Sequence, residues 1–290
     1  MRKNGLFIAV IAMFMGLLLG SCSKDNSNNS NDGKIDPSTI AAANLVAYFP
    51  FDGNGNASVG GLTPDASSKG VTYVAGRRGT GAYQGADNAY LKYVLPTGSK
   101  LKNLKAYSVS LWVKIVATVD GGPEPMIFQM DGTTDWFWGN LFLLQNRNPV
   151  PSDTTNLANY FWKDDAASWK GQRIDSRIGG IFDHWAHLIA TYDNVSSKFC
   201  FYINGVKFKG GEGYEDRKQS DGGPALGDMK FNSANNLYFG GWAARIDGRM
   251  SDDWAGFYKG NIDEFRLYDR ALTATEAKDL YDAEVTQVNP

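Results

Sequence analysis

Six tryptophans lie beside polar residues, a combination that protein sites for sugars use. They are Trp136, Trp138, Trp162, Trp169, Trp242 and Trp254. An indole ring can stack on the apolar face of a sugar, while neighbouring Asp, Asn, Lys or Arg side chains hydrogen-bond its hydroxyl groups. Because the surrounding sequence is polar and loop-like, we expect at least one or two of these rings to be exposed. The alternative for each ring is that it anchors a long loop in a small satellite core.

Other reactive residue types are scarce. His184 and His187 flank a tryptophan at the start of a predicted strand, where a packed or solvated histidine is the simpler interpretation. Cys200 lies in an apolar run and is interpreted as a small buried hydrophobe. These residues leave little for a zinc site. The formal net charge of −2 argues against nucleic acid or an anionic membrane surface as the main partner.

Short β-rich runs, separated by Gly, Asn, Asp and Pro, must position these side chains. We predict strands at 45–51, 71–74, 89–94, 107–116, 126–130, 141–145, 186–192, 198–203, 237–240 and 262–268. Many short strands with turn signals between them are typical of a sandwich or barrel. Asn204-Gly205 predicts a tight hairpin. One helix closes the chain, and Thr273 and Glu276 have the spacing of a capping box at its start.

The last predicted strand carries a carboxylate at an unusual place. Alternation puts Asp263 on the same face as Phe265 and Leu267, and therefore toward the core. A carboxylate that faces a core is costly unless it is paired, hydrogen-bonded or bound to a metal. Glu264 is expected on the opposite face, where it could reach a surface groove.

Four segments, taken in order, resemble the laminin-G-like, concanavalin A-like jelly-roll family. They are Leu45–Asn54, Tyr107–Lys114, His184–Asp193 with Phe201–Gly205, and Gly260–Leu272. The resemblance implies an all-β domain over residues 44–283: a two-sheet antiparallel jelly-roll sandwich with one short C-terminal helix, followed by a tail at 284–290. The stretches 117–185 and 209–236 are longer than a minimal family member needs. We expect them to be elaborated loops at the functional edge.

The family also includes glycosidases, and their carboxylate pattern is missing here. In such enzymes acidic residues alternate along one strand, close to Glu-x-Asp-x-x-Glu, so that two carboxyl groups share the catalytic work. The chain has only six glutamates, Glu124, Glu212, Glu215, Glu264, Glu276 and Glu284, and none forms that pattern. Gly-x-Ser-x-Gly and His-Glu-x-x-His motifs are also missing from the sequence. We therefore predict no catalytic residues, although a hydrolase that uses loop aspartates stays an alternative.

The resemblance further implies one structural calcium ion on the convex side. The residues at the corresponding positions are Asp263 on the last strand, Asp52 after the first strand and the carbonyl of Gly85. Calcium prefers oxygen ligands and accepts backbone carbonyls. Its role would be to hold the chain ends together. The alternative is that Asp263 caps backbone amides and that Asp52 lies in an ordinary turn.

The amino-terminal segment has the pattern of an export signal. Arg2 and Lys3 precede the apolar run 6–19, which is shorter than the ~20 residues that span a bilayer. The ending Leu-x-Gly-Ser-Cys resembles a bacterial lipobox, which implies removal of residues 1–21 and a lipid on Cys22. The polar stretch that follows predicts a flexible tether over 22–43. Its start is similar to the surface-export signals of Bacteroidetes lipoproteins, and a plain spacer is the alternative.

These observations predict a lipid-anchored module on the outer membrane, facing the cell exterior, that binds a polysaccharide or glycoconjugate without catalysis. The lipid would be its only contact with the membrane, and crowding of anchored copies would add avidity. The first alternative is a protein-binding adhesin or assembly subunit, which an exposed apolar or edge-strand patch would favour. The second is a glycoside hydrolase or lyase with carboxylates on loops, roughly 5 to 10 Å apart across a groove.

Overall fold

The structure is a computed structural model that describes residues 35–119, 121–133, 135, 137–146 and 153–286. The predicted signal peptide, Cys22, the first part of the predicted tether, Trp136 and residues 287–290 lie outside this range. The prediction of an all-β sandwich is confirmed, because two mainly antiparallel sheets make up most of the described chain. No helix in the described part of the chain has the length and apolar character needed to cross a membrane.

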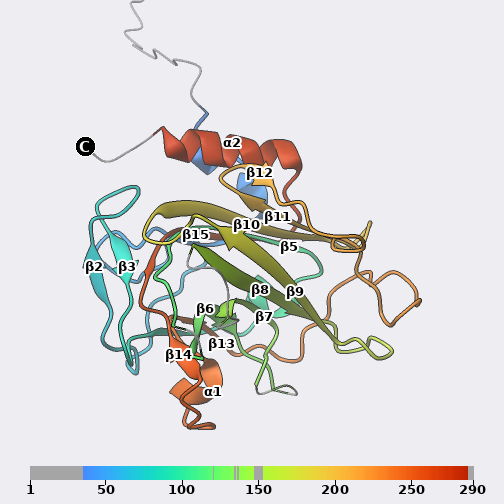
Figure 1. Cartoon of the computed structure of the whole chain (residues 1–290), viewed down its shortest axis with the longest axis horizontal. Coiled ribbons are helices and arrows are strands. Elements are labelled where there is room, and N and C mark those ends of the chain that lie inside the picture. The colour runs from blue at the N-terminus through green and yellow to red at the C-terminus, as the bar shows by residue number, and fades with distance from the viewer. Residues whose placement is uncertain (1–34, 120, 134, 136, 147–152, 287–290) are drawn as a thin grey trace, which may run out of the picture. The chain divides into compact units, whose positions relative to one another are not determined.

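We call the first sheet the helix-side sheet, because helix α2 (Ala274–Val285) lies across its outer face (Figure 1). Its strand order in the described chain is β12-β11-β10-β5-β15-β3-β2, with β1 paired to β15. The strands are β1 (Leu45–Phe49), β2 (Thr72–Val74), β3 (Ala82–Gln84), β5 (Tyr107–Lys114), β10 (Trp185–Asp193), β11 (Lys198–Ile203), β12 (Val206–Lys207) and β15 (Asn261–Tyr268). The predicted hairpin joins β11 to β12, and Asn204 and Gly205 both have the positive φ that its turn requires.

We call the second sheet the aromatic-side sheet. Its strand order is β4-β13-β6-β7-β8-β9, and β14 pairs with β6 in parallel. The strands are β4 (Leu91–Val94), β6 (Glu124–Met130), β7 (Leu141–Asn146), β8 (Thr154–Trp162), β9 (Gly171–Gly179), β13 (Asn236–Phe239) and β14 (Ala255–Phe257). Four short helical turns complete the described elements: η1 (Pro37–Thr39), η2 (Ala42–Asn44), η3 (Lys100–Asn103) and α1 (Ala243–Ile246).

The main core fills the space between the two sheets. Phe239 of β13 lies at its centre, and its ring centroid is 5.2 Å from that of Phe49 and 4.8 Å from that of Phe265. Both contacts are edge-to-face, the geometry that the ring quadrupoles favour. Because all three rings are completely buried, they tie strands of the two sheets together.

The segment 117–185 is richer in strands than we expected. Beyond the predicted strands it contains β8 and β9, which pair along nine residues each, so the prediction of a long loop there was wrong. In β8 all residues after Thr154 are buried on both faces, which removes the alternation that marks a strand. In β9 the inward positions include polar Gln172 and Ser176, which hides the period of two. The stretch 209–236, in contrast, is loop apart from the start of β13 at Asn236.

Strand β15 contains a β-bulge that changes the direction of Asp263. Its register against β5 shifts between Asp263 and Arg266, and Glu264 has a φ of 52°. Ile262 and Phe265 therefore both face the core, while Asp263 pairs with Trp112 of β5 and faces outward. The expectation that Asp263 shares a face with Phe265 was wrong, because strict alternation does not survive the inserted residue.

Residues on both sides of the predicted range 44–283 pack against the domain. Before residue 44, η1 and η2 place Ile40, 9% exposed, in a cluster with Leu272, Ala277 and Leu280 near α2. At the other end, Glu284 is completely buried. The capping box at the start of α2 is confirmed, because Thr273 and Glu276 exchange side-chain to backbone hydrogen bonds of 3.1 and 2.8 Å.

Candidate functional site

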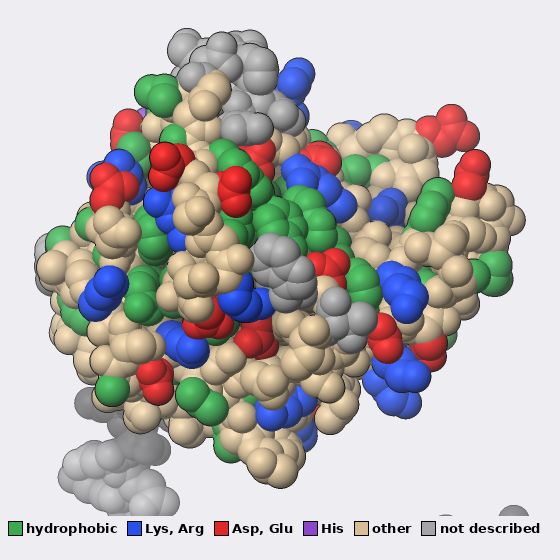
Figure 2. Space-filling model, turned by 90° about the horizontal axis from the view of Figure 1, so that it is seen from below, with side chains coloured by type: hydrophobic (Ala, Val, Ile, Leu, Met, Phe, Trp, Pro, Cys, Tyr) green, Lys and Arg blue, Asp and Glu red, His purple; other side chains and the backbone are tan. Residues whose placement is uncertain are grey.

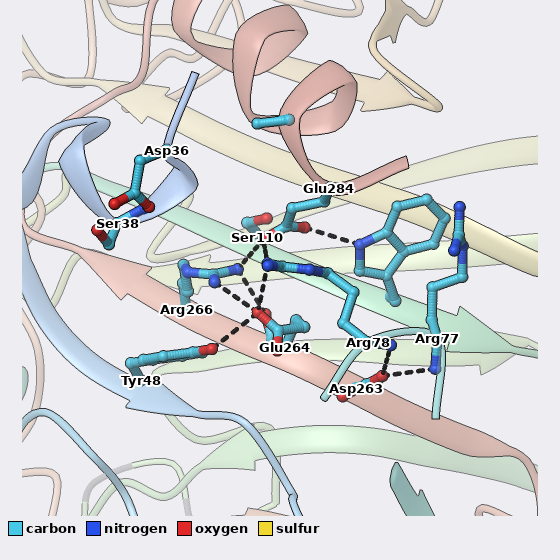
Figure 3. Close-up of polar contacts among 12 residues, drawn as sticks. Asp36, Ser38, Tyr48, Arg77, Arg78, Ser110, Asp263, Glu264, Arg266 and Glu284 are labelled. Atoms are coloured by element: carbon cyan, nitrogen blue, oxygen red, sulfur yellow. Dashed lines mark hydrogen bonds and ion pairs between the residues drawn. The ribbon is translucent and has the colours of Figure 1, made fainter. Parts of the chain in front are cut away.

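A dense cluster of charged side chains lies between the helix-side sheet and α2 (Figure 3). Glu284 of α2 accepts a hydrogen bond from Trp112 Nε1 at 2.7 Å and forms ion pairs with Arg78, at 3.2 Å, and with Arg266. Glu264 pairs with the same two arginines, at 3.2 and 2.5 Å. The two carboxylates and two guanidinium groups compensate one another within a nearly dry space, so the cluster joins α2 to the sheet.

Ser110 and His187 give this cluster a superficial likeness to a hydrolytic site. Ser110 Oγ lies 2.8 Å from His187 Nε2, and Glu284 Oε2 lies 3.5 Å from the same nitrogen. A catalytic triad needs the nucleophile and the orienting carboxylate on opposite ring nitrogens. All three side chains are also completely buried, and burial lowers the pKa of His187 to about 3. The arrangement is therefore structural, as the packed-histidine interpretation predicted.

Asp263, a predicted calcium ligand, holds backbone amides. Its Oδ2 accepts hydrogen bonds from the amides of Arg77 and Arg78 at 2.7 and 2.9 Å. Its buried Oδ1 has no hydrogen-bond partner among the described residues. Burial raises the pKa of Asp263 to about 8 despite these two hydrogen bonds. The unpartnered Oδ1 of Asp263 could serve as a ligand for a cation. The positive charges of the neighbouring Arg77 and Arg78 would repel that cation.

The other two predicted ligands also have contacts that need no metal. Asp52 accepts hydrogen bonds from the amides of Thr80 and of Gly81, the latter at 3.1 Å. The Gly85 carbonyl accepts a hydrogen bond from Gln84 Nε2 at 2.9 Å. No cluster of three or more His, Cys, Asp or Glu side chains that could hold a metal occurs in the described chain. Calcium binding stays a prediction.

The outer face of the aromatic-side sheet carries a second hydrophobic cluster. Phe142 of β7, Tyr160 of β8 and Arg173 of β9 form one cross-strand row. The half-buried ring of Trp138 lies over this row, 5.7 Å from Phe142 and 5.9 Å from Tyr160, nearly parallel to both. The Arg173 guanidinium lies 5.6 Å from the Trp138 ring centroid, within the range of a cation–π contact.

Three more of the predicted tryptophans belong to this cluster. Trp242 is completely buried and donates a hydrogen bond to the Glu124 carbonyl at 2.8 Å. Trp162 is 8% exposed. Both therefore pack into a satellite core, Trp162 from the end of β8 and Trp242 from the residue that precedes α1. Trp254 is half-buried and packs edge-on against Trp242, with 5.2 Å between ring centroids.

Trp169 differs from the other described candidates because 45% of its surface is exposed. It lines a cleft of about 480 Å³, which we call the Trp169 cleft. The other lining residues are Gly171, Gln172, Arg173, Gly213, Asp216, Arg217, Lys218 and Asp221. The face of the molecule opposite α2 shows hydrophobic side chains in one area, bordered by basic and acidic side chains (Figure 2).

Hydrogen bonds hold the two walls of the Trp169 cleft together. The Trp169 amide donates to the Gln219 carbonyl at 2.9 Å. Gln172 Nε2, which is nearly buried, donates to the carbonyls of Trp169 at 2.7 Å and Lys218 at 3.1 Å. None of these bonds uses the indole ring. The cleft is therefore formed before any ligand arrives, and the ring can be removed without breaking it.

Arg173 links the Trp169 cleft to the Trp138 ring. Its side chain lines the cleft and also reaches the face of Trp138. Because four residues span at most ~14 Å, Trp169 and Arg173 lie within the length of a short oligosaccharide. Sequence reasoning selected Trp138 and Trp169 but missed Arg217 and Lys218, which come from the distant loop 209–236. The backbone bond from Trp169 to Gln219 and the side-chain bonds of Gln172 bring them to Trp169.

Comparisons with known proteins agree with this fold. Residues 85–278 match the family described as the concanavalin A-like lectin/glucanases superfamily. No curated protein matches the chain. The binding domain of botulinum neurotoxin serotype G has a similar structure, with a TM-score of 0.54 and 17% identity over 82% of this chain and 50% of that chain. The chain thus spans about half the length of that toxin domain.

Two further similar structures were solved with sugars. Domain 4 of AbnA, an extracellular arabinanase from Geobacillus stearothermophilus, was solved with arabinotriose; its TM-score is 0.50, with 24% identity over 82% of this chain and 98% of that chain. The ligand-binding domain of botulinum neurotoxin serotype D was solved with N-acetylneuraminic acid; its TM-score is 0.56, with 12% identity over 84% of this chain and 52% of that chain. At these identities the likeness establishes the fold.

Proposed function

The chain belongs to the concanavalin A-like lectin/glucanase superfamily, and from this premise we propose that it binds a carbohydrate chain at the Trp169 cleft without cleaving it. The observation that carries the proposal is the exposed Trp169 ring, 45% accessible, in a preformed cleft lined by arginine, lysine and aspartate. Such a ring can stack on the apolar face of a sugar while the charged groups bind its hydroxyls. The arabinotriose and N-acetylneuraminic acid complexes of similar folds support a glycan ligand.

The carboxyl groups of the Trp169 cleft are poorly suited to hydrolysis. A general acid of a glycosidase needs a raised pKa so that it stays protonated near neutral pH. Asp216 pairs instead with Lys198 at 2.9 Å, and this contact lowers the pKa of Asp216. Asp216 is therefore a poor general acid, and this weighs against cleavage at the cleft. We accordingly propose binding without cleavage.

Anchoring belongs to the same proposal and rests on the amino-terminal sequence. A lipid on Cys22, a polar tether and export through the outer membrane would place the cleft just outside the cell. Single sugar contacts are weak, and many anchored copies on one surface would raise the effective affinity for a polymer. Mass spectrometry of the membrane fraction would find a diacyl or triacyl modification on Cys22. An unmodified amino terminus at another residue would contradict the anchor.

The binding proposal is tested with the chain from Ser23 to Pro290 on a glycan array and on polysaccharide affinity gels. Trp169→Ala should weaken binding of any recognised glycan about tenfold or more, since one stacked ring contributes on the order of 1–2 kcal/mol. Trp169→Phe should recover part of the affinity because it keeps a flat ring. Val206→Ala, at a residue that is 68% exposed on β12, is a matched surface control and should bind like the native chain.

Two results would overturn the binding proposal. Full binding by the Trp169→Ala variant would place the ligand elsewhere. Clean failure across plant, host and microbial glycans, with a folded chain, would favour the protein-binding alternative. Because the Trp169 ring makes no hydrogen bond among the described residues, the Ala variant should unfold within about 2 °C of the native chain, which keeps the two causes of failure apart.

A further inference from the structure

We infer that the Trp169 cleft selects an anionic carbohydrate, one that carries carboxylate or sulfate groups. The inference deepens the proposed function and rests on it. It comes from the balance of charge among the side chains that line the cleft. These are three basic residues, Arg173, Arg217 and Lys218, and two acidic residues, Asp216 and Asp221.

Two of these five charges are already neutralised by residues outside the cleft. Asp216 forms its ion pair with Lys198, at 2.9 Å. Arg173 pairs with Asp175, its neighbour on the outer face of β9, at 3.2 Å. These pairs contribute little net field in the cleft. The remaining charges are two positive groups and one negative group.

Arg217 is a positive group without a carboxylate at hydrogen-bond distance in the described chain. Its Nη2 donates to the carbonyls of Gly213 and Tyr214 at 2.8 and 2.7 Å, and its buried Nε has no acceptor. Neutral carbonyls orient a guanidinium but do not cancel its charge. A half-buried cation compensated in this way is costly, and an anion bound in the cleft would offset that cost.

Lys218 supplies the second positive group and places it beside the stacking ring. Its side chain is exposed and forms no ion pair within 4 Å among the described residues, although its charge helps to lower the pKa of Asp216. Gln172 Nε2 bonds the Lys218 carbonyl and the Trp169 carbonyl at once, so the backbones of these two residues lie close together, and both residues line the cleft. A sugar ring stacked on Trp169 would therefore bring a carboxylate or sulfate substituent toward Lys218. Attraction within about one screening length, ~8 Å at physiological salt, is only partly screened.

Asp221 is the group that opposes this interpretation, and it makes the inference testable. It is exposed and unpaired among the described residues. If the ligand is anionic, Asp221 repels it, and Asp221→Asn should strengthen binding. If the ligand is neutral, Asp221 accepts hydrogen bonds from sugar hydroxyls, and the same substitution should weaken binding.

The experiment uses matched pairs of probes with the chain from Ser23 to Pro290. One pair is an oligogalacturonate and its methyl ester; the other is a sulfated oligosaccharide and its desulfated form. By calorimetry, the charged member of at least one pair should bind about tenfold tighter than its neutral partner, with an affinity that falls as NaCl rises from 50 to 300 mM. Which pair responds separates carboxylate from sulfate recognition.

Three variants locate the effect. Lys218→Ala should lower the affinity about threefold to tenfold, and Asp221→Asn should raise it by a similar factor. Lys230→Ala is the control, because this exposed lysine pairs with Asp165 at 3.4 Å outside the cleft. Its affinity should match that of the native chain. Thermal unfolding of each variant verifies that the fold is kept.

The possible failures are distinguishable. If neutral and charged probes bind equally and Trp169→Ala weakens both, carbohydrate binding stands and the anionic preference is overturned. Weaker binding by Asp221→Asn overturns the preference in the same way. If neither charged nor neutral glycans bind to the native chain, the proposed function itself falls, and this inference falls with it.

Discussion

Replacing Glu284 with alanine should loosen the C-terminal helix and lower the stability of the whole domain. The Glu284 carboxylate is completely buried and is held by Trp112 at 2.7 Å, by Arg78 at 3.2 Å and by Arg266. Removal leaves the Arg266 guanidinium, whose side chain is 4% exposed, with Glu264 as its remaining carboxylate partner. The Trp112 indole loses its acceptor at the same time.

The size of the effect follows from burial. Breaking a buried ion pair by removing one partner costs about 3–5 kcal/mol, and the surviving Glu264 contact favours the lower end, about 3 kcal/mol. For a domain of this size 1 kcal/mol corresponds to roughly 2–4 °C, so the melting temperature should fall by about 6–12 °C. The melting temperature of Glu284→Gln should lie between those of the native chain and Glu284→Ala, because glutamine keeps the shape of the side chain and loses its charge.

Asp282→Ala is the matched control on the same helix. Asp282 pairs with Lys278 one turn away, with side chains 47% and 56% exposed, and such surface pairs contribute less than about 0.5 kcal/mol. Thermal and urea unfolding followed by circular dichroism at pH 7 would measure both variants. Equal losses in Glu284→Ala and Asp282→Ala would refute the view that the buried cluster fastens α2 to the sheet.

Three further predictions concern the same face. Burial lowers the pKa of His187 to about 3, so below about pH 6.5 the unfolded chain binds a proton that the folded chain does not bind. The free energy of unfolding should therefore fall by up to ~1.4 kcal/mol for each pH unit below about pH 6.5. In urea unfolding, the free energy of unfolding of His187→Gln should depend less on pH between pH 5 and 7 than that of the native chain. Thr273→Ala should cost about 0.5–2 kcal/mol in thermal unfolding by removing the helix cap, whereas Thr286→Ala at the far end should cost less. If the predicted calcium binds at Asp263, 1 mM CaCl₂ should raise the melting temperature of the native chain and not of Asp263→Ala, and a flat titration would contradict the site.

Patterns that are local in sequence predicted the framework. β5 and β10 alternate between core and outer faces, and Asn204-Gly205 fixes one hairpin. β8 escaped prediction because tertiary contacts bury both of its faces, so its sequence carries no period of two. The bulge at Glu264 escaped because a positive φ at a glutamate has no sequence signal.

The sequence predicted that tryptophans would form the candidate site, but it did not predict which of their rings are exposed. Trp242 and Trp169 both follow turn-forming, polar sequence, yet one is completely buried and the other is 45% exposed. What separates them is which loop folds over the aromatic-side sheet, a property of the whole fold. Arg217 and Lys218 reach the cleft because hydrogen bonds join two loops that are distant in sequence. No spacing of residues in the sequence predicts this contact.

The cluster under α2 and the Trp169 cleft use their polar groups in opposite ways. Under α2, Glu264, Glu284 and the arginines satisfy one another, and little remains for a ligand. In the Trp169 cleft, Lys218 and Asp221 are exposed and form no ion pair with another described residue, beside a ring that is 45% exposed. Since a sugar bound there would break few contacts within the protein, the Trp169 cleft is where binding can add free energy. If Asp221→Asn raises the affinity, recognition of charge supplies this free energy of binding. If it lowers the affinity, recognition of hydroxyl groups supplies it.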